Sequence, residues 1–129
     1  MKTFETSLIV TQKYIDDLNH VNNVHYVQWV QDIAKAHWQS KATEAMQTQY
    51  GWFLLSHFIE YKSAALLNDT INLKTYIDKV EGIKYTRIVE MHNASTNKLI
   101  AKSETKWCFI NLKTERPTRI PQDIVDLFD

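Results

Sequence analysis

The sequence predicts an α+β protein in which an antiparallel sheet of about five strands wraps around one long central helix. Three observations predict this class. Apolar residues recur at three- and four-residue steps only between residues 24 and 50, a period of two follows Gly51, and a run rich in β-branched residues precedes both. The two glycines and two prolines separate these segments without forming a linker, so we expect a single domain over residues 1–129.

The first strand is expected over residues 4–13, because this run is rich in residues that favour strands. Asn22 or Asn23 is then placed to cap a long helix, which reaches Tyr50 and is closed by Gly51. The apolar stripe of this helix consists of Val27, Val30, Ile33, Ala34, Trp38, Ala42 and Met46.

The rest of the chain reads as an antiparallel meander with tight turns at Glu81-Gly82 and at the polar run 93–97. Pro121 can open a short C-terminal helix. The expected strands cover residues 52–61, 71–78, 83–92 and 99–112. A sheet that buries one face needs a cover, and only the long helix can provide it, so the sheet should curl around that helix as in the hotdog fold.

Composition excludes several classes of function. Fifteen basic and fifteen acidic residues give a formal charge of zero, so nothing global draws the chain to nucleic acid. No window approaches the roughly 20 apolar residues of a membrane span, and the first residues lack the apolar run of a signal peptide, so we expect a cytoplasmic protein. The single cysteine, Cys108, cannot form an internal disulfide and is expected to be an inert buried thiol.

The most informative segment lies between the first strand and the helix. It reads Asp16-Asp17-Leu18-Asn19-His20-Val21-Asn22-Asn23-Val24-His25-Tyr26. It resembles the motif of the 4-hydroxybenzoyl-CoA thioesterase-like family of hotdog proteins, which is aspartate, two residues, glycine, then His-Val-Asn-Asn and an aromatic residue. The segment is also similar to acyl-carrier-protein thioesterases. A weaker resemblance extends to residues 60–64, 67–70 and 116–121.

Two departures from the family pattern are asparagines. Asn19 replaces the glycine before the histidine, and Asn68 replaces a second glycine. Asparagine is the non-glycine residue that best tolerates left-handed backbone angles, so both turns are expected to survive. Counting back from His20 makes Asp16 the match for the family's aspartate, although a one-residue slip would select Asp17.

The resemblance implies hydrolysis of an acyl thioester, without a cofactor or a metal. Asp16 would attack the thioester carbonyl or activate a water molecule, and the sequence leaves both roles open. The backbone N–H groups of Asn23 and Val24 would bind the developing oxyanion at the helix start. His20 and Asn22 would orient Asp16, the water or the carbonyl.

The resemblance further implies a homodimer or homotetramer with sites between subunits. The substrate would be an acyl-CoA or an acyl-carrier protein, and Val24, Tyr26 and Tyr61 would contact it. Coenzyme A also needs a cationic surface. The basic candidates are Lys62, Lys102 and Arg116, with Arg87, Lys106 and Arg119 as further guesses from strand position.

Other interpretations stay open. Asp16 and Asp17 can stabilise a turn without catalysis, and Asn22 can act only as a helix cap. His20 with Asp16 could imitate the base and acid of a hotdog dehydratase or hydratase, and a non-catalytic acyl-binding protein could keep the same fold. A metal site at His20 and His25 is disfavoured, because zinc motifs on a helix use spacings of three or four.

Overall fold

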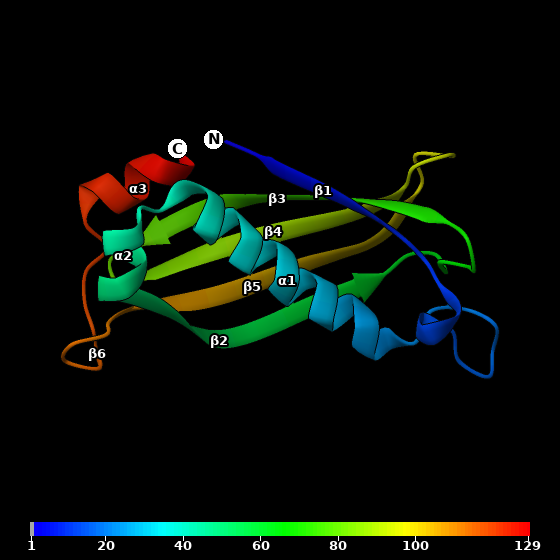
Figure 1. Ribbon diagram of the computed structural model, residues 1–129, viewed down its shortest axis with the longest axis horizontal. Helices are drawn as coiled ribbons and strands as arrows, with labels where there is room; N and C mark the ends of the chain where they lie inside the picture. Colours follow the sequence, from blue (N-terminus) through cyan, green and yellow to red (C-terminus); the bar gives the residue numbers. More distant parts are fainter. Residues whose placement is uncertain (1) are drawn as a thin grey trace.

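The computed structural model describes residues 2–129 and contains a six-stranded antiparallel sheet crossed by one long helix, α1 (Figure 1). The strands lie in the order β1, β3, β4, β5 and β2, and the short β6 pairs with β5. The predicted class is therefore confirmed. The elements are β1 (Phe4–Ile9), η1 (Gln12–Tyr14), α1 (Asn23–Lys41), α2 (Glu44–Gln49), β2 (Tyr50–Tyr61), β3 (Thr70–Glu81), β4 (Lys84–Asn93), β5 (Leu99–Asn111), β6 (Arg116–Pro117) and α3 (Gln122–Phe128).

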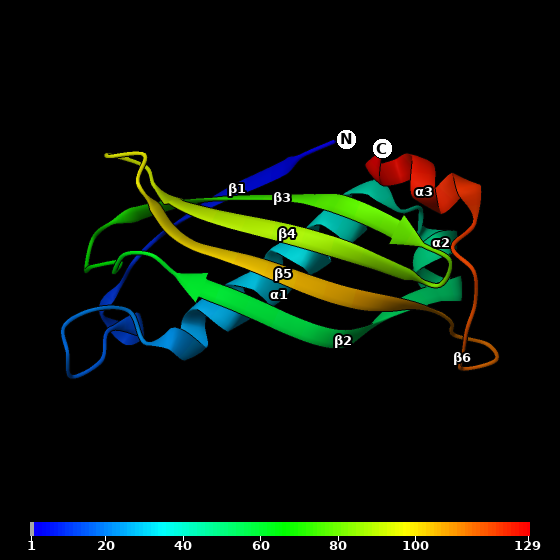
Figure 2. The same cartoon turned by 180° about the vertical axis from the view of Figure 1, so that it is seen from behind.

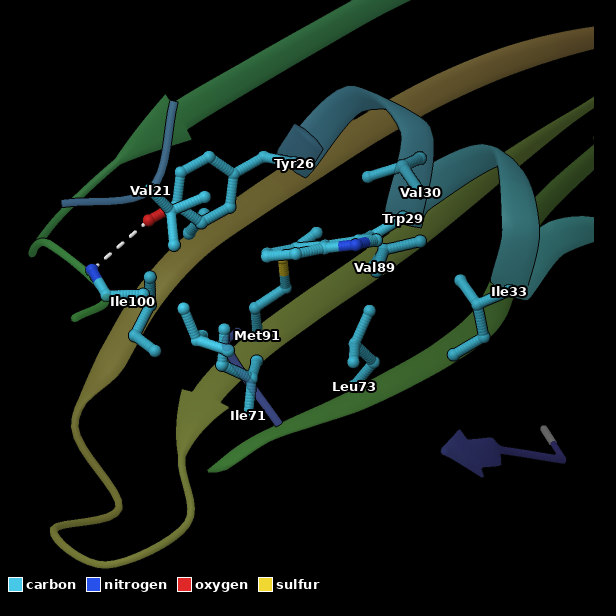
Figure 3. Close-up of a cluster of buried hydrophobic side chains, with 13 residues drawn as sticks. Val21, Tyr26, Trp29, Val30, Ile33, Ile71, Leu73, Val89, Met91 and Ile100 are labelled. Atoms are coloured by element: carbon cyan, nitrogen blue, oxygen red, sulfur yellow. Dashed lines mark hydrogen bonds between the residues drawn. The ribbon is translucent and has the colours of Figure 1, made fainter. Parts of the chain in front are cut away.

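The α1 helix lies across the concave face of the sheet, whereas the opposite face carries no helix of residues 2–129 (Figures 1 and 2). The helix buries one stripe against the middle strands. Val30 and Ile33 pack with Val89 and Met91 in the main hydrophobic cluster, which Figure 3 shows. Burying a side chain of this size contributes about 1.5–3 kcal/mol, so this stripe fixes the helix on the sheet.

The predicted long helix is wrong at its C-terminal end. α1 stops at Lys41, and the extended Ala42 is followed by Thr43, whose hydroxyl accepts a hydrogen bond from Met46 N–H (3.1 Å) and caps the separate helix α2. Apolar periodicity continues across this break, because α2 also contributes a half-buried side chain, Met46. Gly51 does not close a helix; it lies in β2 opposite Ile110.

The first strand is also shorter than predicted. β1 ends at Ile9, and residues 12–14 form the 3-10 turn η1. The chain turns there because Tyr14 packs edge-on against Trp29 of α1, with ring centroids 5.1 Å apart. The remaining predicted strands and the C-terminal helix are confirmed, with ends displaced by three residues at most.

Candidate active site

Residues 15–22, here named the Asp16 turn, form a closed loop that directly precedes the first residue of α1. Ile15 and Val21 pair as an isolated antiparallel bridge, and Asp16 N–H donates to the His20 carbonyl (3.1 Å). Asn19 N–H donates to the Asp16 carbonyl (3.0 Å), and Asn19 has a φ of 63°. The predicted left-handed asparagine is thus confirmed here, as it is at Asn68, where φ is 71°.

Asp16 is held by its own turn. Its Oδ1 accepts a hydrogen bond from Leu18 N–H (2.9 Å), and we find no bond between Oδ2 and residues 2–129. Asp16 is half-buried, whereas the neighbouring Asp17 is exposed and forms no such bond within the same residues. The two interpretations of Asp16 are compatible, because one carboxylate oxygen supports the turn and the other is left for chemistry.

Asn22 is the N-cap of α1. Its Oδ1 accepts from Val24 N–H (3.0 Å), and its own N–H donates to the Tyr14 carbonyl (3.0 Å). Of the two predicted oxyanion donors, Val24 N–H is therefore occupied by the cap, whereas Asn23 N–H has no acceptor among residues 2–129. The free N–H of Asn23 points out of the positive end of the helix dipole.

A second loop pins the start of α1. Tyr26 is buried, with 3% of its surface exposed, and its hydroxyl accepts a hydrogen bond from Ala65 N–H (3.2 Å), the dashed line in Figure 3. Val21 N–H donates to the Ala65 carbonyl (3.0 Å). Burial raises the pKa of Tyr26, so its phenol stays neutral. Tyr26 thus positions the Asp16 turn from within the core.

Three other predicted substrate contacts, Tyr61, Lys62 and Val24, lie near the start of α1. The Tyr61 ring, at the end of β2, meets the Tyr26 ring edge-on at 5.3 Å and is 41% exposed. Lys62 follows it and forms an exposed ion pair with Glu60 (3.2 Å). Val24 is 62% exposed on the first turn of α1. Tyr61 and Val24 therefore leave apolar surface open beside the Asp16 turn.

The remaining predicted cations are scattered. Lys102 alternates with the buried Ala101 and Ser103, so it faces away from α1 on β5. Arg116 lies in β6, at the opposite end of the molecule from the Asp16 turn (Figure 1). A single chain therefore does not gather these cations around Asp16.

The guess that Arg87 meets coenzyme A is wrong. Arg87 is completely buried, and its guanidinium donates to His37 Nδ1 (2.9 Å), Thr75 Oγ1 (2.9 Å) and the Tyr85 hydroxyl (3.2 Å). Strand alternation carries the signal that was missed: Arg87 is two residues before Val89, which is buried on the face that meets α1.

Sequence reasoning also missed a cavity of about 410 Å³ between the flank of α1 and the sheet. Its walls include the rings of Trp38, Trp52, Tyr85 and Trp107. Asp16, His20 and Asn22 line none of the four cavities described for residues 2–129. The same residues contain no group of three His, Cys, Asp or Glu side chains that could hold a metal ion, and no helix long and apolar enough to cross a membrane.

A sheet curled around one helix, with a capped acidic turn at the helix start, defines a protein of the hotdog-fold class. The chain belongs to the Thioesterase-like superfamily, whose family model matches residues 10–128. No curated protein matches the chain at a significant level.

Solved structures share the fold over almost the whole chain. The 1,4-dihydroxy-2-naphthoyl-CoA thioesterase from Synechocystis is 16% identical, with a TM-score of 0.83 over 98% of this chain and 95% of that one. A hypothetical protein from Staphylococcus aureus in complex with CoA is 19% identical, with a TM-score of 0.86 over 98% and 81%. A mutant 4-hydroxybenzoyl-CoA thioesterase in complex with 4-hydroxybenzoyl-CoA is 11% identical, with a TM-score of 0.89 over all of both chains. At these identities the likeness establishes the fold.

Proposed function

We propose that this protein hydrolyses an acyl thioester, with Asp16 as the reacting carboxylate. The observation that carries the proposal is that the Asp16 turn and the helix start that follows it hold a carboxylate oxygen, Asp16 Oδ2, and a backbone donor, Asn23 N–H, neither of which has a hydrogen-bond partner among residues 2–129. The donor lies at the positive end of α1, where negative charge developing on the thioester oxygen is stabilised.

Two routes use this arrangement. In one, Asp16 Oδ2 attacks the carbonyl carbon and the C–S bond breaks, which gives an acyl–Asp16 anhydride that water then hydrolyses. In the other, Asp16 takes a proton from a water molecule that attacks the carbonyl directly. Both routes yield a carboxylic acid and a free thiol. His20 and Asn22, which belong to the same turn, would orient the reacting groups.

The substrate we propose is an acyl-CoA or an acyl-carrier protein. The structures of hotdog relatives bound to CoA and to 4-hydroxybenzoyl-CoA support a CoA thioester. Lys62, Lys102 and Arg116 are the cations that we assign to the anionic part of the substrate, together with apolar contacts from Val24 and Tyr61. We further propose a cytoplasmic protein consisting of one thioesterase domain.

A homo-oligomer with shared sites is part of the proposal. β2 is an edge strand of 12 residues, and its exposed side chains include Phe53 (60%), Leu55 (46%) and Phe58 (61%). A long apolar edge strand is a ready template for pairing with another chain. A second copy related by a twofold axis would pair its own β2 antiparallel to this one, which covers the apolar residues of both.

The first test compares Asp16→Asn with Asp17→Asn in a thiol-release assay on short, long, branched and aromatic acyl-CoAs. Asparagine keeps the Oδ1 atom that accepts from Leu18 N–H, so the turn should persist in Asp16→Asn. We expect its turnover to fall by about 10² to 10⁴, the usual contribution of a positioned acid or base. Asp17→Asn should keep wild-type turnover. Full activity in folded Asp16→Asn would exclude the proposed role of Asp16.

The oligomer is tested by light scattering on the eluate of a size-exclusion column. We expect a dimer or a tetramer for the wild type, and dissociation for Phe58→Lys, which puts a charge on the edge strand. A stable wild-type monomer with full thioesterase activity would contradict the shared-site proposal.

A further inference from the structure

A single long-range hydrogen bond joins the Asp16 turn to the rest of the fold. The other hydrogen bonds of the turn join residues at most eight positions apart, as Asn22 N–H and the Tyr14 carbonyl are. Among residues 2–129, only the bond from Val21 N–H to the Ala65 carbonyl (3.0 Å) links the turn to a distant part of the chain. The local bonds set the shape of the turn. The bond to Ala65, together with the buried Val21 side chain, therefore sets where Asp16 lies relative to the start of α1.

Ala65 belongs to the loop that joins β2 to β3, and this loop is fastened on both sides of it. Before Ala65, Lys62 N–H donates to the Ile100 carbonyl of β5 (2.7 Å). After it, Asn68 N–H donates to the Val10 carbonyl (2.9 Å), just beyond the end of β1. The loop is therefore held by the sheet at both ends, and it can serve as a fixed support for the turn.

Tyr26 holds Ala65 in place from the side of α1. Ala65 is completely buried, so its N–H depends on a partner within the protein, and the Tyr26 hydroxyl accepts it at 3.2 Å (Figure 3). The Tyr26 ring meets Trp29 edge-on at 5.4 Å and Tyr61 at 5.3 Å, so the hydroxyl has a fixed position. Without the hydroxyl, a buried donor would be left unpaired, which is costly. Residue 65 would then shift to find another partner, and the carbonyl that accepts from Val21 would shift with it.

We infer that the Tyr26 hydroxyl is a positioning group for catalysis at Asp16, and that it acts through the backbone of Ala65. This inference rests on the proposed thioesterase function and deepens it. Tyr26 is only 3% exposed, so its hydroxyl affects the reaction through Ala65 and Val21 and not through the contact with substrate that the sequence led us to expect. A displacement of about 1 Å in a reacting group can cost about 10²-fold in rate, so a small shift of the turn is measurable as a change in kcat.

The first experiment measures kcat, KM and melting temperature for the wild type, Tyr26→Phe and Tyr85→Phe. Tyr85→Phe is the matched control, because the buried Tyr85 hydroxyl also accepts one hydrogen bond at 3.2 Å, from Arg87 in the core, and the ring is kept. Both substitutions should lower the melting temperature. Only Tyr26→Phe should lower kcat, by about tenfold or more, with KM nearly unchanged. Wild-type kcat in folded Tyr26→Phe, or an equal loss in Tyr85→Phe, would overturn the inference.

The double variant Asp16→Asn/Tyr26→Phe separates positioning of the carboxylate from a general loss of structure. Once the reacting carboxylate is gone, nothing is left for Tyr26 to position, so the residual kcat of the double variant should equal that of Asp16→Asn alone. The decrease in melting temperature caused by Tyr26→Phe should persist in the double variant. A further decrease in kcat, as large as that seen with Asp16 present, would show that the hydroxyl does not act through Asp16.

Amide hydrogen exchange, measured residue by residue by NMR, tests the link through Ala65 without any substrate. In Tyr26→Phe, the N–H of Val21 should exchange about tenfold faster than in the wild type, and more than in Tyr85→Phe, because its acceptor is no longer held. Unchanged exchange at Val21 in Tyr26→Phe would overturn the link to Asp16. A wild type that hydrolyses no thioester would overturn the proposed function instead, so the two failures appear in separate measurements.

Discussion

Acid should destabilise this protein through His37, the completely buried histidine on α1. The Arg87 guanidinium donates to His37 Nδ1 at 2.9 Å, and because arginine can only donate, Nδ1 must be unprotonated. The ring is also stacked on Phe4 at 5.0 Å and meets Phe128 edge-on at 4.9 Å. A proton on Nδ1 would break the bond to Arg87 and bury a second positive charge beside the first.

Burial, with smaller contributions from Arg87 and Lys41, lowers the pKa of His37 from 6.5 to about 4. The unfolded chain therefore binds more protons than the folded protein between these values, so stability is full above pH 6.5 and falls as the pH drops through this window. A decrease of about 2.5 pKa units corresponds to a loss of about 3 kcal/mol once the pH is below both values. At about pH 5.5 the loss is already about 1 kcal/mol.

The assay is urea unfolding of the wild type and His37→Gln at about pH 7.5 and about pH 5.5. Glutamine offers an oxygen that can accept from Arg87 but does not titrate, so His37→Gln should lose about 1 kcal/mol less stability than the wild type on acidification. Comparing the change in stability between the two pH values in the wild type with that in His37→Gln removes the effects of all other titrating groups. Equal losses of stability in the two proteins would refute the linkage between His37 and Arg87.

Substitutions at three further positions test the turns and the buried cation. Asn22→Ala removes the cap on Val24 N–H and should lower stability by about 1 kcal/mol; if Asn22 also orients the reacting groups, kcat will fall as well, and an unchanged kcat limits Asn22 to capping. Asn68 has a φ of 71°, a left-handed angle that alanine disfavours and glycine adopts freely. In thermal unfolding, Asn68→Ala should lower the free energy of unfolding by about 1–2 kcal/mol, and Asn68→Gly by only a few tenths. Arg87 is buried and has no ion pair within residues 2–129. Arg87→Met, which keeps most of the side-chain volume, should therefore be at least as stable as the wild type in urea unfolding. Arg87→Ala should lose about 2–4 kcal/mol of stability because it leaves a cavity.

Local rules predicted the elements that depend on neighbouring residues. Alternation located β3 to β5, and the left-handed tolerance of asparagine anticipated the angles at Asn19 and Asn68. The same rules failed where two local signals competed. Apolar periodicity runs through Ala42, but the hydroxyl of Thr43 caps a new helix, and an N-cap outweighs a continuing stripe because it satisfies a donor that the break exposes.

In the candidate site, too, the features set by neighbouring residues could be predicted and those set by distant residues could not. Most hydrogen bonds of the Asp16 turn join residues within eight positions of one another, so the sequence was enough to identify Asn22 or Asn23 as the possible cap. Asp16 was selected by the family resemblance, and its catalytic role stays a prediction. The guess from strand position placed Arg87 at the surface, but its side chain is completely buried on the strand face that meets α1. Its hydrogen bonds to His37 and Thr75 depend on two elements distant in sequence.

The sequence could not predict the cavity lined by aromatic rings, for a different reason. Its rings belong to residues 38, 52, 85 and 107, which only the folded sheet brings together. The pairing of two β2 edges that we propose for the dimer could not be predicted by local rules either, because it joins residues of two copies of the chain. Breaking this pairing with Phe58→Lys should abolish hydrolysis and leave Asp16, its turn and the cavity intact in each folded monomer. Loss of activity without loss of fold would then distinguish a site completed by two copies from one that each chain contains by itself.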